Sequence, residues 1–146
     1  MKLLTSVLII EIIRTFSSHT NQSQLNNSEV TLFHRFSDLV EDNYKQHWQL
    51  SQYLEIIGTS DSRLNSVCRR ISNQAPKQLI HARLLLEAKR LLVFTKIPIS
   101  DICYEIGFSD PAYFSRFFKK HTGQTPTFLH KGQNDQFIQL KNIKKL

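Results

Sequence analysis

The chain has 146 residues, which is room for one ordinary domain or two very small ones. With 40% hydrophobic and 21% charged residues, its composition is that of a globular protein, and no apolar run reaches the roughly 20 residues of a membrane span. The net charge of +7 falls entirely within residues 59–131, which hold twelve Lys and Arg against five Asp and Glu. Such a concentration of charge favours a local contact with a polyanion.

Residues 1–28 are expected to form an apolar helix followed by a polar linker. Leu3–Phe16 is apolar on most sides, so another surface should cover it, and it is a candidate dimerisation helix. Charged residues soon interrupt the run, and the absence of a small-residue cleavage pattern argues against a secretion signal. Cys68 and Cys103 lie in apolar patterns, as expected for buried thiols of a reduced, cytoplasmic protein.

A helical pattern begins at Val30, and its apolar positions share one face: Leu32, Phe33, Phe36, Leu39, Val40 and Tyr44. A short helix follows and ends at Gly58, where a left-handed cap is expected. Ser60 or Asp61 caps the next helix. Four apolar side chains of that helix are predicted to face inward: Leu64, Val67, Cys68 and Ile71.

Pro76 is well placed as the first residue of a long helix that runs to residue 95. A helix over residues 99–106 ends at Gly107, and the pair Asp110-Pro111 predicts the start of another. Thr125-Pro126 repeats this signature and predicts a last short helix. Because no strand pair is apparent, the chain is predicted to be all-α.

Two segments of the chain share one arrangement, Leu50–Arg70 and Ile99–Lys120. Each has a short apolar helix, a glycine, a tight turn with an acidic residue, and a helix that ends in two basic residues. Apolar residues follow Gly58 at +6 and +9 and Gly107 at +7 and +10, so the second turn is one residue longer. This spacing is typical of the helix-turn-helix, whose second helix lies in the major groove of DNA. The long helix between them would span about 30 Å, close to the ~34 Å that separates successive major grooves on one side of DNA.

The stretch ISDICYEIGFSDPAYFSRFFKKHTGQTP closely resembles the signature of the AraC/XylS family of bacterial transcription regulators, and the stretch from QLSQYLEIIG onward resembles the preceding part of the same domain. The resemblance covers about residues 31–131. It implies a seven-helix domain with two homeodomain-like helix-turn-helix units, bridged by a long central helix, that binds asymmetric operator DNA and usually activates transcription. The expected organisation is an apolar helix and linker in 1–28, the DNA-binding domain in 29–131 with helix-turn-helix units at 49–73 and 99–121 and a linker helix at 76–95, and a basic tail in 132–146.

The resemblance also implies RNA polymerase as a partner and the bacterial cytoplasm, at the nucleoid, as the location. Most members of the family carry a separate effector-binding domain, and the apolar N-terminal run resembles the helix that often closes such a domain and pairs two subunits. The resulting hypothesis is that the chain is a shortened form of a longer regulator, without its ligand sensor.

The family's groove positions, carried over residue by residue, give eight candidates for base reading: Ser62, Arg63, Asn65, Ser66, Pro111, Ala112, Tyr113 and Arg116. The fork of Arg116 suits guanine and the amide of Asn65 suits adenine, while Ala112 or Tyr113 could touch a thymine methyl. The candidate phosphate contacts are Arg69, Arg70, Lys77, Lys119, Lys120 and Lys131. Each of these residues could also be ordinary solvated surface.

Four aromatic residues are expected in the core rather than stacked on bases, because duplex DNA offers no splayed bases: Phe108, Phe114, Phe117 and Phe118. Leu54 and Cys103 hold the inner position of the first helix of each unit, where small residues are usual, and Leu54 is larger than expected.

No arrangement of residues suggests an enzyme, a metal site or a cofactor. The six His show no metal-ligand spacing, and HExxH, CxxC and phosphate-binding glycine motifs are missing from the sequence. Two alternatives to a sequence-specific regulator remain open. One is a basic helical interaction module that pairs through its N-terminus and binds no specific DNA site, and the other is a membrane-surface helix at Leu3–Phe16.

Overall fold

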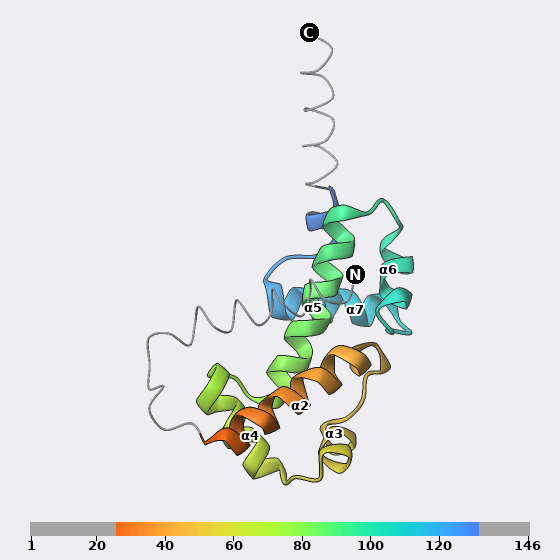
Figure 1. The fold of residues 1–146 in the computed structure, drawn as a ribbon. Helices are drawn as coiled ribbons and strands as arrows, with labels where there is room; N and C mark the ends of the chain where they lie inside the picture. Colours follow the sequence, from red (N-terminus) through yellow and green to blue (C-terminus); the bar gives the residue numbers. More distant parts are fainter. Residues whose placement is uncertain (1–25, 132–146) are drawn as a thin grey trace. The chain divides into compact units, whose positions relative to one another are not determined.

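The computed structural model describes residues 26–131, which form helices and no strand (Figure 1). The elements are α2 (Asn27–Asn43), the 3-10 helix η1 (Tyr44–Gln46), α3 (Leu50–Ile57), α4 (Asp61–Ser72), α5 (Pro76–Phe94), α6 (Ile99–Glu105) and α7 (Pro111–Thr122). Residues 126–131 form a further helical segment. The all-α prediction is confirmed for the described residues. The predicted apolar helix at 3–16, most of the predicted linker and the basic tail at 132–146 lie outside the described residues.

The described chain divides into two compact units. The first contains residues 26–42 and 48–80, and the second contains residues 43–47 and 81–131. Helix α5 begins in the first unit and continues into the second. The five residues 43–47 belong to the second unit although their neighbours on both sides in the sequence belong to the first.

The first unit has one core made by α2, α3 and α4. Its buried side chains are Leu32, Phe33, Phe36, Val40, Tyr53, Ile57, Leu64, Val67 and Cys68. The ring of Tyr53 packs edge-on against Phe36 at 5.8 Å and against Trp48 at 5.4 Å. The apolar patterns therefore located this core, except that Leu39 and Ile71 are only half-buried. Burial raises the pKa of the Cys68 thiol to about 12, which keeps it protonated.

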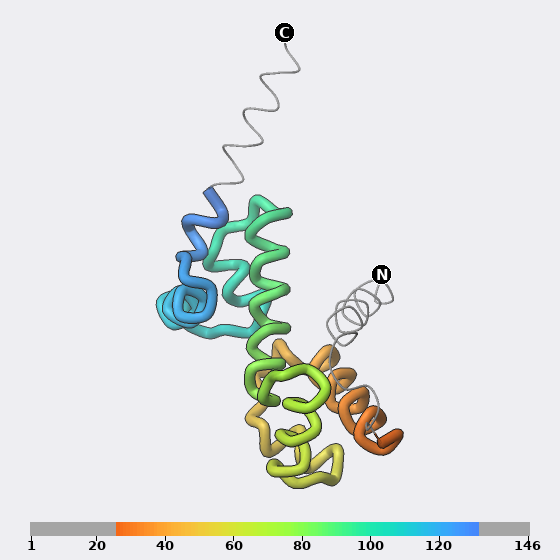
Figure 2. The backbone as a smooth tube through the Cα atoms, turned by 90° about the vertical axis from the view of Figure 1, so that its left-hand side faces the viewer, coloured from red at the N-terminus to blue at the C-terminus, as the bar shows by residue number. Residues whose placement is uncertain are grey.

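The second unit is built on the later part of α5, with α6 and α7 packed beside it (Figures 1 and 2). Its core contains Leu84, Ala88, Leu91, Leu92, Ile102, Cys103, Ile106, Phe108, Phe114 and Phe118. Phe108 lies 5.3 Å from Phe114 and from Phe117, measured between ring centroids. The prediction of an aromatic core is confirmed for three of the four residues, while Phe117 is half-buried.

Tyr44 is a correction to the predicted pattern. It was expected on the apolar face that begins at Leu32, but α2 ends at Asn43 and Tyr44 begins η1 in the second unit. Its ring is buried there, and the guanidinium of Arg83 lies 4.1 Å from its centroid. When the apolar period continues beyond the end of a helix, the sequence cannot reveal which core buries the last apolar residue.

Within residues 26–131, no helix combines the length and the apolar character needed to cross a membrane.

Candidate nucleic-acid interface

The first helix-turn-helix consists of α3, a turn at Gly58, and α4. Gly58 adopts φ 71° and its N–H donates to the Leu54 carbonyl at 2.9 Å. The next N–H, that of Thr59, donates to the same carbonyl at 3.2 Å. The backbone then extends, and the Ser60 hydroxyl accepts from the Arg63 N–H at 3.3 Å, which caps α4. The cap is therefore Ser60 and not Asp61.

The second helix-turn-helix consists of α6, a turn at Gly107, and α7. Gly107 adopts φ 86°, and the N–H of Phe108 donates to the Cys103 carbonyl at 3.0 Å. Asp110 caps α7, since its carboxylate accepts from the Ala112 N–H at 2.8 Å, and Pro111 is the first helical residue, as its fixed φ favours.

The two turns are closed by the same hydrogen bond. In each, the N–H of the residue after glycine donates to the carbonyl four residues before the glycine. The extra residue of the second turn lies between the glycine and the cap, because Ser60 follows its glycine by two positions and Asp110 by three. The repeat read from sequence spacing is thus also a repeat of backbone geometry.

Leu54 and Cys103 hold equivalent positions but differ in burial. Cys103 is fully buried, while Leu54 is half-buried at the edge of α3. The larger side chain was expected to occupy an inner position. Instead the inner positions of α3 belong to Tyr53 and Ile57, so the size of Leu54 does not disturb the packing.

One face of α4 packs on the core and the opposite face is exposed. The buried residues are Leu64, Val67 and Cys68. Among the candidate base-reading residues, Ser62, Arg63 and Ser66 are exposed and Asn65 is half-buried. The Nε of Arg69 donates to the Asn65 Oδ1 at 3.3 Å, so a predicted phosphate contact orients a predicted base-reading amide.

Helix α7 is divided in the same way. Phe114 and Phe118 are buried, while Ala112, Tyr113 and Arg116 are exposed and Pro111 is half-buried. The side chain of Arg116 is 71% exposed, and its Nη2 lies 3.9 Å from the Asp110 Oδ2, which is a loose ion pair. Because this pairing is weak, the guanidinium is available to an anion or a base edge.

All six candidate phosphate contacts are exposed, three in each unit. Arg69, Arg70 and Lys77 belong to the first, and Lys119, Lys120 and Lys131 belong to the second. Besides the bond from Arg69 to Asn65, the Nη1 of Arg70 donates to both carboxylate oxygens of Glu29, at 2.8 and 2.9 Å.

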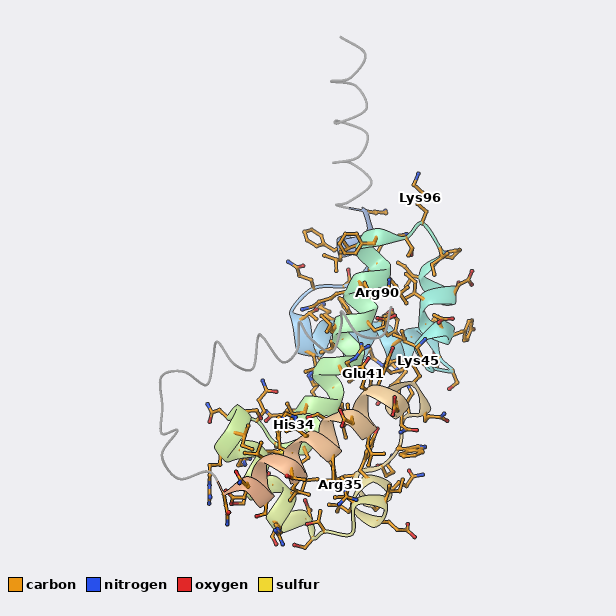
Figure 3. The ribbon with its side chains drawn as sticks, viewed as in Figure 1. His34, Arg35, Glu41, Lys45, Arg90 and Lys96 are labelled. Atoms are coloured by element: carbon orange, nitrogen blue, oxygen red, sulfur yellow. The ribbon has the colours of Figure 1, made fainter. Side chains whose placement is uncertain are left out.

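A basic residue that the charge distribution did not single out lies near the first turn. Arg35 on α2 is exposed (Figure 3), and with Arg63 it lines a shallow depression of about 380 Å³. Gly58 and Thr59 line the same depression. Arg35 was missed because it lies outside the strongly basic stretch and reaches this place only through packing of α2.

The described residues hold no group of three or more His, Cys, Asp and Glu that could bind a metal ion. The rings of His81 and His121 nevertheless lie 5.0 Å apart, packed on Phe117 at 5.2 and 4.6 Å. The proximity of these two histidines was not predicted from the sequence, in which they are far apart.

Comparison with known proteins agrees with this geometry. A family model described as a helix-turn-helix domain matches residues 53–131, which is more than half of the chain. The virulence regulon transcriptional activator VirF of Yersinia enterocolitica is 31% identical over 93 residues, which is 64% of this chain and 34% of VirF. Histidine kinase P4 of Formosa agariphila is 29% identical over 132 residues, which is 85% of this chain and 10% of the kinase. The chain therefore spans between a tenth and about a third of the length of these two relatives.

The DNA-binding domain of AdpA, a global transcriptional factor solved in complex with a target DNA, has a similar fold. The TM-score is 0.62 at 17% identity, over 72% of this chain and 94% of that domain. The matched residues, the paired turns and the shared fold together show that this chain belongs to the AraC/XylS family of transcription regulators and contains that family's double helix-turn-helix DNA-binding domain.

Proposed function

We propose that this chain is a sequence-specific DNA-binding transcription regulator that reads two major-groove segments, one with α4 and one with α7. The observation that carries the proposal is the repetition of one helix-turn-helix geometry in the two units. In each unit a glycine turn with the same closing hydrogen bond leads into a helix with one buried apolar face and one exposed polar and basic face.

In this mechanism phosphate contacts hold the register and base contacts supply the specificity. Arg69, Arg70, Lys77, Lys119, Lys120 and Lys131 are the proposed phosphate contacts. The exposed face of α4 supplies Ser62, Arg63, Asn65 and Ser66, and that of α7 supplies Pro111, Ala112, Tyr113 and Arg116. Arg116 is proposed to fork onto a guanine and Asn65 onto an adenine.

Activation of transcription, with RNA polymerase as a partner, is proposed from the likeness to VirF, a protein named as an activator. We further propose a bacterial cytoplasmic location at the nucleoid, pairing of two chains through Leu3–Phe16, and the domain boundaries 1–28, 29–131 and 132–146. No enzymatic activity is assigned, because the relative named as a histidine kinase shares only 10% of its length with this chain.

The test is selection of duplexes from random DNA with the purified chain, followed by mobility-shift titration of the enriched duplex at several salt concentrations. Two enriched segments with centres about 10 base pairs apart are expected, with an affinity that falls steeply as salt rises. An unselected duplex that displaces the enriched one equally well would show that the chain is a non-specific module. Weak binding without salt dependence would reject DNA as the ligand.

A further inference from the structure

A short segment outside both helix-turn-helix units contacts the turn of the second one. This segment, Tyr44–His47, consists of η1 and the residue after it, and we name it the hook. It belongs to the second unit, although it precedes the first helix-turn-helix in the sequence. Neither its composition nor its charge suggested a role in the site.

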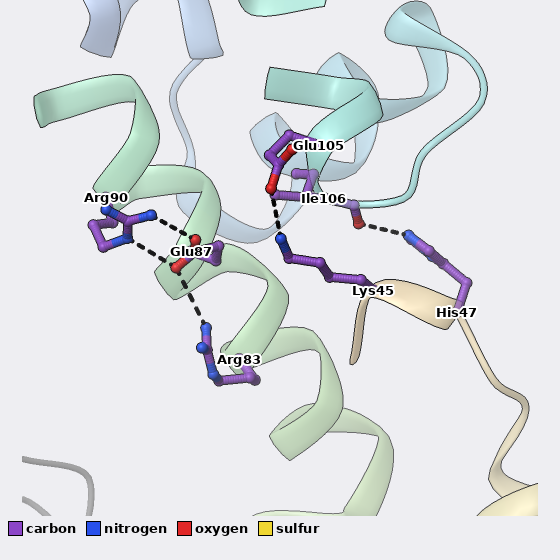
Figure 4. A network of polar contacts seen from close by, with 7 residues as sticks. All are labelled: Lys45, His47, Arg83, Glu87, Arg90, Glu105 and Ile106. Atoms are coloured by element: carbon purple, nitrogen blue, oxygen red, sulfur yellow. Dashed lines mark hydrogen bonds and ion pairs between the residues drawn. The ribbon is translucent and has the colours of Figure 1, made fainter. Parts of the chain in front are cut away.

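Two side chains of the hook bind the end of α6 (Figure 4). The Lys45 Nζ donates to the Glu105 Oε1 at 2.7 Å. The Nε2 of His47 lies 3.2 Å from the Ile106 carbonyl oxygen, and its ring packs edge-on against Phe108 at 4.4 Å. The hydrogen bond to Glu105 raises the pKa of the Lys45 ammonium, which therefore stays charged at neutral pH. The hook thus contacts Glu105, Ile106 and Phe108, which surround the turn glycine.

The backbone of the hook also lies against that glycine. A Cβ atom added to Gly107 would lie 1.9 Å from the carbonyl oxygen of Lys45 and 2.9 Å from its carbonyl carbon. No side chain fits at that separation, so the absence of one allows the hook and the turn to meet.

The hook is itself held on its other side by α5. Its residue Tyr44 is buried beneath the guanidinium of Arg83, at 4.1 Å. Arg83 lies 3.8 Å from Glu87, which accepts from Arg90 at 2.8 Å (Figure 4). Hydrogen bonding to Arg90 lowers the pKa of the Glu87 carboxyl, which therefore stays ionised at neutral pH. The hook ends at His47, a non-glycine residue whose backbone lies in the left-handed region at φ 53°.

We propose that Lys45 and His47 are positioning residues for the DNA-reading helix α7. They fix the turn Ile106–Phe108 against α5, and α7 begins only three residues later, with its proposed base-reading residues in its first two turns. The Lys45–Glu105 pair is exposed and contributes little to stability, so the inference concerns the position of the turn and not the stability of the unit. This inference rests on the proposed function, because it concerns how α7 reads DNA.

The test compares two variants with a matched control. Lys45→Met removes the ion pair and keeps an unbranched side chain. His47→Asn removes the ring and its contacts, while asparagine tolerates the left-handed backbone. Lys96→Met is the control, because it removes the same charge from a lysine of the same unit that projects away from the helices (Figure 3).

The measurement is the affinity of each protein for the duplex enriched by the unmodified chain and for two derivatives, each with one half-site scrambled. The half-site whose scrambling penalty falls in Arg116→Ala is assigned to α7. Scrambling this half-site is expected to lower the DNA affinity of the unmodified chain and of Lys96→Met strongly. In the double variant Lys45→Met/His47→Asn the loss of affinity should be roughly tenfold smaller, which is the equivalent of about one base contact. The penalty at the other half-site should be unchanged.

A purely structural role would give another result. Loss of folded protein lowers the apparent affinity for every duplex by the same factor and leaves the loss on scrambling either half-site unchanged. That outcome would overturn the inference. Rescue adds a second criterion. Lys45→Glu should weaken discrimination at the α7 half-site, and the charge swap Lys45→Glu/Glu105→Lys should restore it. Failure of the swap to restore it would also count against the hook.

Hydrogen exchange in the free protein separates failure of the inference from failure of the proposed function. The N–H groups of Gly107 and Phe108, which donate within the turn, should exchange several-fold faster in the double variant than in Lys96→Met. Unchanged exchange would overturn the positioning role of the hook, whatever the result of the DNA-binding measurement. If exchange is faster but the unmodified chain shows no preference for any DNA sequence, the proposed function is rejected, and so is the role of the hook in base reading by α7.

Discussion

Gly58 and Gly107 hold the same place in the two helix-turn-helix units, and both have a left-handed backbone, at φ 71° and 86°. Their surroundings differ. A Cβ atom on Gly58 would meet no atom within 4 Å, whereas one on Gly107 would meet the Lys45 carbonyl oxygen at 1.9 Å. The first turn therefore needs glycine for its backbone conformation, and the second needs it for conformation and for space. One residue type at one position of a repeat can thus answer two different constraints.

The cores of the two units show a related difference. The apolar positions of α4 are filled by Leu64, Val67 and Cys68, whereas α7 uses phenylalanine at Phe114 and Phe118. Larger side chains on α7 extend its packing to Phe108 and, through that ring, to His47. The second helix-turn-helix is therefore packed against the hook, whereas the first is packed against α2.

The largest expected effect comes from substituting alanine at the two glycines. Gly58→Ala should cost about 1 kcal/mol, because alanine is strained in the left-handed region. Gly107→Ala should cost about 3 kcal/mol, because overpacking against the Lys45 carbonyl adds to the same strain. Urea unfolding of both variants and the unmodified chain measures the difference. Equal losses would mean that the hook does not limit the space at Gly107.

The next largest effect concerns the arginines of the two reading helices. Arg63→Ala and Arg116→Ala should each weaken binding of the enriched duplex by about tenfold to a hundredfold, since a base contact is worth about 1–3 kcal/mol. Each should relax base preference in a different half-site. Repeated selection with each variant measures this.

The control for these arginines is Lys89→Ala, an exposed residue of α5 outside the candidate contacts. It should leave base preference unchanged. If both arginine variants relaxed the same half-site, the assignment of one helix to each half-site would be wrong. A uniform loss on all duplexes would identify a phosphate contact instead.

Loss of the helix caps should have a smaller and similar effect in both units. Ser60→Ala and Asp110→Ala should each lower the free energy of unfolding by about 1 kcal/mol, because each leaves a helix N–H without its acceptor. Ser60→Thr and Asp110→Asn retain an oxygen acceptor and should lose much less. Thermal unfolding of the four variants checks this, and a large loss in Asp110→Asn would point to a role of its charge beyond capping.

The smallest effect should come from substituting Glu29, which forms an ion pair with Arg70 in the first unit. Glu29→Gln should cost under about 1 kcal/mol of stability, as the pair is partly exposed. It frees Arg70 for phosphate and should steepen the salt dependence of DNA binding by up to about one contact. Glu55→Gln, which removes an exposed acid of α3, is the control. Identical salt slopes in the two variants would exclude Arg70 from the phosphate contacts.

Local features of the structure were predictable because the signals that produce them are local. The turn glycines, the cap of α7 and the start of α5 at Pro76 follow from neighbouring residues in the sequence, whereas the cap of α4 was narrowed only to Ser60 or Asp61. The exposed faces of α4 and α7 were predictable too, since the helical period places Arg63 and Arg116 away from the buried residues. Leu54 was misjudged because its burial depends on how α3 lies on its neighbours.

The sequence by itself determined that residues 26–131 are all-α, that they repeat a helix-turn-helix and that the basic charge accompanies that repeat. These properties depend on periodicity, caps and composition, which operate over a few residues. Only the tertiary structure decided that Tyr44 leaves the first core for the second, and that Lys45 and His47 contact a turn about sixty residues away. Such contacts arise when distant segments pack together, and no local pattern records which backbone carbonyl will come to lie against a glycine.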